Sequence, residues 1–234
     1  MCGRYYRQAD KQRIAEAMHA EVPFTVSASY NVAPQTEQPV IRLNKDTGAR
    51  EAAMMRWGLL PYFAKDSKPD YSTINARSET VSTSPIYREP MKKRRCLLPA
   101  DGFFEWRALG AKSKQPYAIT LADERTFAFA GLWARWKDKA TNDVVETFAI
   151  LTTDPNELMT REKIHDRMPV ILNPKDYERW LQPGDPQRLP TDLLRPFPAE
   201  SMKCWQVSRD VGNVKNDRPE LIAPIAHTDS LFGG

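Results

Sequence analysis

Residues 96–152 read CLLPADGFFEWRALGAKSKQPYAITLADERTFAFAGLWARWKDKATNDVVETFAILT, and most of the architecture can be read from them. The stretch holds apolar and aromatic runs of strand length, separated by short polar connections. We expect strands at 96–98, 103–107, 117–121, 127–133 and 147–152. Strands joined by such short connections favour antiparallel neighbours, so the core is expected to be a sheet.

Weaker patterns flank this stretch on both sides. Further strands are expected at 2–6, 40–43, 52–57, 168–172 and 202–207. Helices are expected over 11–20, within 80–94, from 154 and over 175–181. Asp10 should cap the first of these, and Asp154 followed by Pro155 should begin the third. Residues 29–34 read as a loop and the proline-rich residues 182–198 as a surface segment.

The expected fold is α+β, with a mostly antiparallel, barrel-like β core flanked by short helices in a single domain. That domain should span residues 1–222, and residues 223–234 should form a C-terminal tail. No run approaches the ~18 apolar residues of a membrane span, and the N-terminus lacks a signal-peptide core. We therefore expect a cytoplasmic protein without membrane contact, associated with the nucleoid if the source is bacterial.

Charge and cysteine content exclude few functions. The chain of 234 residues has 34 Lys and Arg against 30 Asp and Glu, a net charge of +4 that permits nucleic-acid binding without requiring it. Its three cysteines and three histidines lack zinc-ligand spacing, so no metal and no cofactor are expected. Cys96 and Cys204 lie in apolar or aromatic surroundings typical of buried small side chains. No dimerisation motif is visible, and a monomer is expected.

Cys2 is the most informative single residue. Removal of Met1 would leave an α-amine and a thiol on adjacent carbons, a pair that no lysine or internal cysteine offers. The α-amine has a reference pKa of ~7.8 against ~10.4 for lysine, so much more of it is neutral at physiological pH. A neutral amine forms a Schiff base with an aldehyde, and the thiol can close a thiazolidine ring. The ring-opened sugar of an abasic site is such an aldehyde. The alternative is that Cys2 stands there by chance.

Two further residues could transfer protons. Glu105 lies within the aromatic run Asp-Gly-Phe-Phe-Glu-Trp, where burial would raise its pKa. Strand alternation could equally point it at solvent. His165 is flanked by charged residues in Ile-His-Asp-Arg-Met-Pro, which suits a surface, structural or catalytic histidine.

Several residues could contact a nucleic acid. Asn75 and Arg77 in Ile-Asn-Ala-Arg-Ser-Glu could hold a hydroxyl or amine and a phosphate, or simply begin a helix. Arg4 would share a strand face with Cys2. Base stacking, worth ~1–3 kcal/mol per base, could use one or two of four aromatic residues, the others being packed in the core. These aromatic residues are Trp57, Tyr62, Phe63 and Trp106.

Taken together, the segments resemble the SRAP family, the SOS response-associated peptidases that include abasic-site crosslinking proteins. Seven short matches occur in order along nearly the whole chain, which makes the resemblance specific. They are Met-Cys-Gly-Arg at 1–4, Tyr-Asn-Val-Ala-Pro at 30–34, Arg-Trp-Gly-Leu-Leu-Pro at 56–61, Ile-Asn-Ala-Arg-Ser-Glu at 74–79, Pro-Ala-Asp-Gly-Phe-Phe-Glu-Trp at 99–106, Ile-His-Asp-Arg-Met-Pro at 164–169 and Val-Ser-Arg-Asp-Val-Gly-Asn-Val-Lys-Asn at 207–216.

The resemblance implies a covalent thiazolidine crosslink between Cys2 and abasic sites in single-stranded DNA, including sites at single-strand/double-strand junctions, in the DNA damage (SOS) response. It implies catalytic roles for Cys2, Asn75, Glu105 and His165, with accompanying lyase cleavage and self-processing. Phosphate contacts are implied for Arg4 and Arg77. The DNA path would be lined by Asn31, Pro34, Trp106 and Thr152. Where family members often have tryptophan, this chain has Tyr62-Phe63, so its junction wedge would be built differently.

Two other classes of function remain open. Cys2 could be the nucleophile of a cysteine-type peptidase, whose most evident substrate is the Met1–Cys2 bond itself. Alternatively, Arg4, Arg77 and the aromatic residues could serve a non-catalytic binder of single-stranded nucleic acid. Such a binder would be indifferent to abasic sites and strongly dependent on salt.

Overall fold

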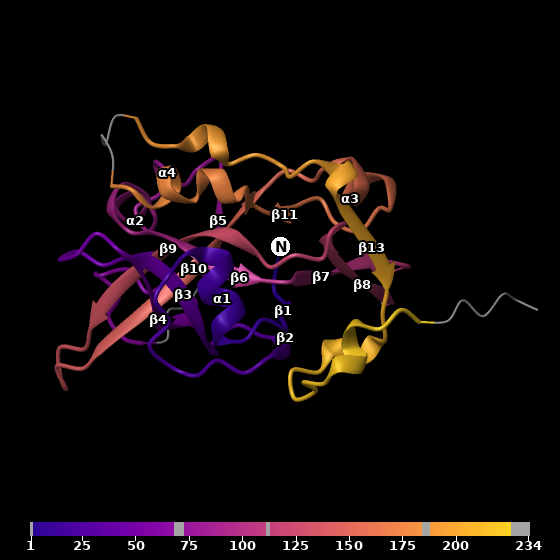
Figure 1. Ribbon diagram of the computed structural model, residues 1–234, viewed down its shortest axis with the longest axis horizontal. Coiled ribbons are helices and arrows are strands. Elements are labelled where there is room, and N and C mark those ends of the chain that lie inside the picture. The colour runs from indigo at the N-terminus through magenta and orange to yellow at the C-terminus, as the bar shows by residue number, and fades with distance from the viewer. Residues whose placement is uncertain (1, 68–72, 111–112, 184–187, 226–234) are drawn as a thin grey trace, which may run out of the picture.

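The computed structural model describes residues 2–67, 73–110, 113–183 and 188–225, which form two β-sheets with short helices around them (Figure 1). The strands are β1 (Tyr5–Arg7), β2 (Ser29–Val32), β3 (Glu37–Leu43), β4 (Arg50–Trp57), β5 (Asn75–Arg77), β6 (Arg95–Ala100), β7 (Gly102–Ala108), β8 (Lys114–Leu121), β9 (Phe127–Lys137), β10 (Val144–Thr153), β11 (Met168–Pro169), β12 (Ile171–Leu172) and β13 (Met202–Gln206). The α-helices are α1 (Lys11–Met18), α2 (Arg88–Lys93), α3 (Glu157–Arg161) and α4 (Tyr177–Leu181). Short 3₁₀ turns occupy Pro174–Asp176, Thr191–Leu193, Ala199–Ser201, Arg209–Gly212 and Pro219–Ile222.

The larger sheet closes on itself. Strand β10 pairs in parallel with β4 and antiparallel with β9, while β9 pairs with β6, β6 with β3 and β3 with β4. These pairings form a ring, which leaves these five strands without a free edge and confirms the expected barrel-like core. The α+β class and the dominance of antiparallel pairs are confirmed as well.

The second sheet has the order β13-β8-β7-β1-β2, and all its pairs are antiparallel. Its middle strand β7 lies between β8 and β1, so the residues that follow the N-terminus run beside the Phe-Phe-Glu-Trp segment. Side chains alternate across β7. Phe103 packs in the core between the sheets, whereas Phe104 packs against Tyr6 and Val211 on the other face.

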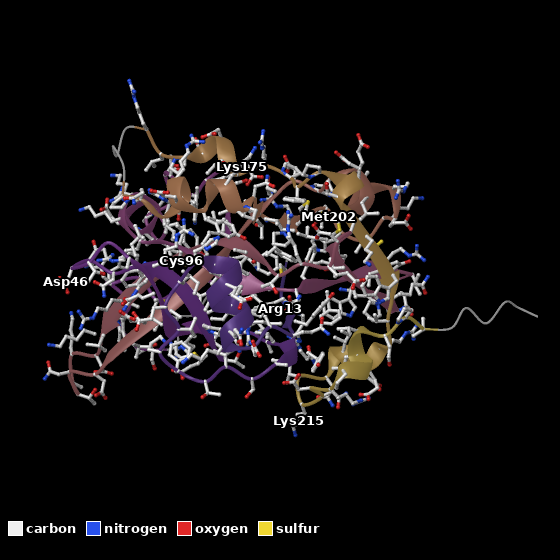
Figure 2. All side chains as sticks on the ribbon, viewed as in Figure 1. Arg13, Asp46, Cys96, Lys175, Met202 and Lys215 are labelled. Atoms are coloured by element: carbon white, nitrogen blue, oxygen red, sulfur yellow. The ribbon has the colours of Figure 1, made fainter. Side chains whose placement is uncertain are left out.

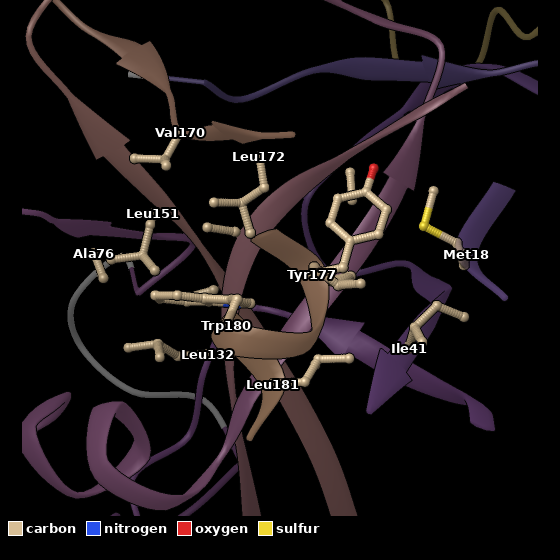
Figure 3. Packing of buried hydrophobic residues seen from close by; sticks show 14 of the residues in the cluster. Met18, Ile41, Ala76, Leu132, Leu151, Val170, Leu172, Tyr177, Trp180 and Leu181 are labelled. Atoms are coloured by element: carbon tan, nitrogen blue, oxygen red, sulfur yellow. The ribbon is translucent and has the colours of Figure 1, made fainter. Parts of the chain in front are cut away.

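Helix α4 closes one side of the barrel, as Figure 3 shows for Trp180 and Tyr177 against the side chains of the strands. Trp180 is fully buried and its indole N–H donates to the carbonyl of Cys96 at 2.8 Å. Burying a large apolar side chain stabilises the fold by ~1.5–3 kcal/mol, so this single helical turn anchors the proline-rich segment that follows it. Cys96 is fully buried, as expected from the sequence, while Cys204 is only half-buried.

Gly102 is required by a close approach. A Cβ atom at this position would lie 2.2 Å from the ring of Tyr6, which no side chain can tolerate. Tyr6 can therefore pair with Gly102, and its ring centre lies 5.4 Å from that of Phe104, with the two rings tilted by 49°. The glycine thus sets how closely the N-terminal strand lies against β7.

Three expectations about local structure are wrong. Residues 29–34 contain strand β2, because pairing with β1 (Tyr5 opposite Val32) supplies backbone partners that a local pattern does not reveal. Residues 168–172 are split at Val170, so that β11 pairs with β10 and β12 with β9. Helix α3 begins at Glu157 rather than after Asp154, as described next.

The N-cap of α3 is Asn156, whose side chain accepts a hydrogen bond from the backbone N–H of Met159. Asp154 instead lies 3.3 Å from the guanidinium of Arg167. The Asp10 cap of α1 is confirmed, since its carboxylate accepts from the backbone N–H of Arg13. No helix in the described residues is long and apolar enough to cross a membrane. The expected tail lies mostly outside the described residues, because its positions 226–234 are not among them.

Candidate active site

Cys2 is fully buried where the two sheets meet, within the cluster that includes Trp57, Phe103 and Phe148. Its thiol lies 3.8 Å from the carbonyl oxygen of Arg4. Burial raises the pKa of the thiol well above its usual range, and the charge of Glu105 raises it further. The sulfur is therefore protonated at neutral pH, and Glu105 is close enough to act on it electrostatically.

Asn75 holds the backbone of Cys2 in place. Its amide Nδ2 donates to the carbonyl oxygen of Cys2 at 2.9 Å, across 73 positions of sequence. Strand β5 positions this side chain by pairing in parallel with β10, with Asn75 opposite Ile150. The hydroxyl of Tyr87 donates to the backbone carbonyl of Asn75 at 2.9 Å. Among the described residues, the buried Oδ1 of Asn75 has no hydrogen-bond partner, so it can accept one from a nearby group.

Glu105 lies on the inner face of β7 and is only 2% exposed. The sequence allowed either a buried or a solvent-facing side chain here, and the structure shows the buried one. Burial raises the pKa of this carboxyl to about 7, and the charge of Asp166 also acts to raise it. A carboxyl group that is half-ionised near neutral pH can both accept and donate a proton. Glu105 is thus suited to general acid–base catalysis beside Cys2.

His165 lies on the loop after α3, with 27% of its side chain exposed. Its Nδ1 accepts a hydrogen bond from the backbone N–H of Arg167 at 3.0 Å. Oδ1 of Asp166 also lies 2.8 Å from this nitrogen, and the Asp166 side chain is 87% exposed. Burial lowers the pKa of His165, which favours the neutral ring.

Arg167 ties the His165 loop to the strand ends beside Asn75. Its guanidinium bonds Glu79, which follows β5, and donates to the carbonyl oxygen of Thr152 at 2.7 Å. The pairing holds the pKa of Glu79 at about 2, mainly through the hydrogen bond from Arg167. Neither Arg167 nor Tyr87 was assigned a role from the sequence. Arg167 stands in the His165 motif, whereas Tyr87 carries no local signal.

The residues proposed to contact DNA occupy different environments. Arg4 is half-buried and donates to the carbonyl of Gly3 at 3.1 Å, while Arg77 is exposed. Arg77 lies opposite Thr152 in the pairing of β5 with β10. Thr152 itself is fully buried. The two arginines are placed near Cys2 and Asn75 by the chain itself, and their contacts with DNA stay predictions.

Asn31, Pro34 and Trp106 lie on or just after strands β2 and β7. The amide of Asn31 donates to the carbonyl oxygens of Val211, Asn213 and Asn216, so it holds the 211–216 turn against β2. Pro34 is half-buried just after β2. Trp106 packs on the face of β7 opposite Glu105. The DNA-lining role of these three residues also stays a prediction.

The aromatic candidates for base stacking separate clearly. Trp57 is fully buried and its indole N–H donates to the carbonyl of Ile74 at 2.9 Å, so it offers no face to a base. Tyr62 and Phe63 are 75% and 48% exposed and lie edge to face at 5.3 Å. No group of three or more His, Cys, Asp or Glu side chains in the described part of the chain is placed to hold a metal ion.

Comparison with known proteins gives a consistent result. The sequence model of the family described as SOS response associated peptidase (SRAP) matches residues 1–214. The Bacillus subtilis protein "Abasic site processing protein YoqW" is 42% identical over 227 residues, which cover 95% of this chain and 99% of that protein. The chicken (Gallus gallus) "Abasic site processing protein HMCES" is 35% identical, over 84% of this chain and 66% of that protein. A crystal structure of a Bacteroides thetaiotaomicron protein superimposes with a TM-score of 0.85 at 30% identity, covering 96% of this chain and all of that one.

Proposed function

Because the chain belongs to the SOS response associated peptidase (SRAP) family, we propose that it processes abasic sites in single-stranded DNA, by bonding them to Cys2 as a thiazolidine. The observation that carries the proposal is the burial of Glu105, with its raised pKa, beside an N-terminal cysteine held by Asn75. Such a site supplies proton transfer where an amine and a thiol start the mature chain.

The proposed reaction begins once Met1 has been removed. The α-amine of Cys2 attacks the aldehyde carbon of the ring-opened sugar, and loss of water gives a Schiff base. The thiol sulfur then adds to the imine carbon, and the thiol proton passes to the nitrogen. The net reaction joins protein and DNA with release of one water. Both new bonds end on the same sugar carbon, so hydrolysis must reverse two steps.

Glu105 and His165 take the proton transfers in this proposal. A carboxyl with a pKa of about 7 can accept a proton from the attacking amine and return it to the departing hydroxyl. His165, whose neutral form is favoured by burial, can donate its ring proton toward the sugar oxygen as the ring opens. Asn75 fixes the Cys2 peptide, which brings the amine into a constant position relative to both groups.

The proposal includes the DNA around the site. Arg4 and Arg77 would contact phosphates, and the exposed pair Tyr62 and Phe63 would serve at a single-strand/double-strand junction. A Schiff base also acidifies the neighbouring sugar carbon, so strand cleavage by β-elimination would accompany capture. We propose that the protein acts as a monomer in the cytoplasm, at the nucleoid in a bacterium, during the response to DNA damage.

A peptidase that uses Cys2 as a thiolate is less well supported. Its nucleophile would need a lowered pKa, whereas burial and Glu105 both raise the pKa of this thiol. Self-removal of Met1 is the one peptidase reaction that the sequence favours. Expression without methionine aminopeptidase, followed by intact-mass measurement, tests it. A retained Met1 would rule out self-processing.

The proposed capture is tested on a denaturing gel with a single-stranded oligonucleotide that carries one abasic site. Wild-type protein should give a heat-stable adduct. Cys2→Ser keeps the α-amine but not the thiol, so it should lose the stable adduct while strand cleavage persists. Equal amounts of heat-stable adduct from wild type and Cys2→Ala would contradict the proposal.

A further inference from the structure

A pocket of about 530 Å³ lies between helix α3 and strand β13, outside the catalytic residues described above. We call it the α3–β13 pocket and define it by Arg107, Tyr117, Leu158, Arg161, Cys204 and Gln206. Figure 2 shows Met202, which also lines it, at the upper end of β13 beneath α3. Its volume falls within the range of ~300–1,000 Å³ that is usual for ligand pockets.

The pocket is connected to Glu105 by the paired strands β7, β8 and β13, and to His165 by the chain that follows α3. Across the sheet, Glu105 on β7 lies opposite Tyr117 on β8, which lies opposite Gln206 on β13. Neighbouring strands lie ~4.8 Å apart, so the backbones of the lining residues Tyr117 and Gln206 lie within ~10 Å of that of Glu105. On the other side, the chain passes from Arg161 at the end of α3 to His165 within four positions. The pocket is therefore adjacent to both proton-transfer groups.

The pocket combines charged and apolar surfaces, and its lining holds three cationic side chains (Arg107, Arg161 and Lys203) and one carboxylate, Glu162. The guanidinium of Arg107 lies 5.2 Å from the centre of the Tyr117 ring, and no ion pair within the described part of the chain includes it. Arg161 lies 3.4 Å from Glu162, an exposed contact that is weak in water. Leu158, Met202 and Ile225 supply apolar lining. An unpaired guanidinium stacked on an aromatic ring beside apolar side chains is suited to a phosphate joined to a planar base.

We propose that the α3–β13 pocket binds the nucleotide that flanks the abasic site on one side, with its phosphate at Arg107 and Arg161 and its base against the apolar lining. The inference rests on the proposed function, since it assigns a neighbour of the same DNA strand. An abasic sugar has no base to hold, so affinity must come from the adjacent nucleotides. The pocket supplies such a contact on the side of α3.

Crosslinking of two sets of oligonucleotides tests the pocket. One set carries nucleotides on both sides of the abasic site, and the other lacks them on the 5′ or on the 3′ side. Compared with wild type, the variant R107Q/R161Q should crosslink the fully flanked oligonucleotide roughly tenfold more slowly at low protein concentration, with a weaker salt dependence. On the oligonucleotide that lacks the nucleotide bound here, the variant and wild type should react equally.

The matched control is K175Q/R179Q, which removes the same charge from exposed positions on the 3₁₀ turn before α4 and on α4. Lys175 lies at the top of Figure 2, across the molecule from the C-terminal turns. This control should crosslink both sets at the wild-type rate. If R107Q/R161Q matches wild type and the control on flanked DNA, the pocket does not bind the strand, while the proposed crosslink stands. If wild type forms no adduct at all, the proposed function fails first.

Cys204 provides a second readout that does not depend on folding of the variant. Its half-buried thiol is part of the pocket, and burial raises its pKa to about 11, so alkylation is best followed at about pH 9. Single-stranded DNA bound to wild-type protein should slow alkylation of Cys204, as measured by peptide mass spectrometry. An unchanged alkylation rate at saturating DNA would overturn the inference.

Discussion

Two carboxylates in the same motif, Asp101 and Glu105, are almost equally buried, at 3% and 2% exposure. Asp101, between β6 and β7, accepts hydrogen bonds from the backbone N–H groups of Gln8 and Ala9 at 2.6 and 2.8 Å. It also accepts one from the Thr126 hydroxyl at 2.6 Å and lies 3.3 Å from Arg13. Glu105, four positions later, has its pKa raised to about 7, because burial outweighs the groups that favour its charged form.

The difference suits the two carboxylates of one short segment to different tasks, a structural one for Asp101 and the proposed proton transfer for Glu105. Donors fixed by the backbone stabilise the charge of Asp101, which joins the N-terminal strand to the β6–β7 turn. The environment of Glu105 instead keeps its proton loosely balanced near neutral pH, and this balance is what a proton-transfer group needs. Isosteric amide substitutions at the two positions should therefore have opposite effects.

Glu105→Gln should have the largest effect. The amide cannot exchange protons, so the crosslinking rate with abasic DNA should fall roughly 10²- to 10⁴-fold. Stability should not fall, because the amide carries no charge whose burial costs free energy. Rates from quenched-flow gels and urea unfolding measure the two quantities. A variant that crosslinks at the wild-type rate would remove Glu105 from the mechanism.

Asp101→Asn is the matched substitution. It removes the charge that several donors share, so the free energy of unfolding should fall by about 2 kcal/mol. At a temperature where the variant is folded, crosslinking should proceed at nearly the wild-type rate. If stability were unchanged, or if the folded variant lost crosslinking, the division of roles between the two carboxylates would be wrong.

The pH dependence of stability tests the raised pKa of Glu105. The folded pKa of Glu105 is raised above its model value of 4.5, so the folded state binds the proton more tightly. The stability gained from this tighter proton binding is fully present below about pH 4.5 and is lost as pH rises toward about 7. Glu105→Gln should remove a slope of roughly 1 kcal/mol per pH unit in this window. If the free energies of unfolding of wild type and Glu105→Gln, measured in urea, changed with pH in parallel, the raised pKa would be contradicted.

The smallest effect is expected for Thr126→Val. This change removes one donor to Asp101 and leaves the backbone donors in place, so stability should fall by about 1 kcal/mol. Crosslinking should be unaffected. In the double variant with Asp101→Asn, the loss in free energy of unfolding should be smaller than the sum of the two single losses, because both residues belong to one hydrogen-bond network. Full additivity would show that the hydroxyl does not contribute through Asp101.

Local sequence pattern was enough to predict many of the strands and to single out part of the candidate site. The strands within 96–152 and the Asp10 cap follow from composition and alternation, and Glu105 was recognised as a carboxylate in an aromatic run. Closure of the barrel was expected only in outline. Its parallel β4–β10 contact joins Trp57 to Phe148, and no local signal specifies a pairing over that separation.

Long-range contacts explain the remaining differences. Strand β2 exists because β1 supplies its partners, and Trp57 is buried by the barrel rather than offered to a base. The hydrogen bond from Tyr87 to Asn75 and the bridge from Arg167 to Glu79 depend on chain paths that only the fold defines. The chemistry proposed for Cys2 follows from the sequence alone, because it depends on adjacent atoms of one residue.

Intact-mass and peptide analysis of the wild-type protein after incubation with an abasic oligonucleotide tests this chemistry most directly. The account predicts a chain that lacks Met1 and has gained the mass of the oligonucleotide less one water, with the link on Cys2 and unaffected by heating. A chain that crosslinks while it still carries Met1 or an acetyl group, or a link that maps to a lysine, would contradict it.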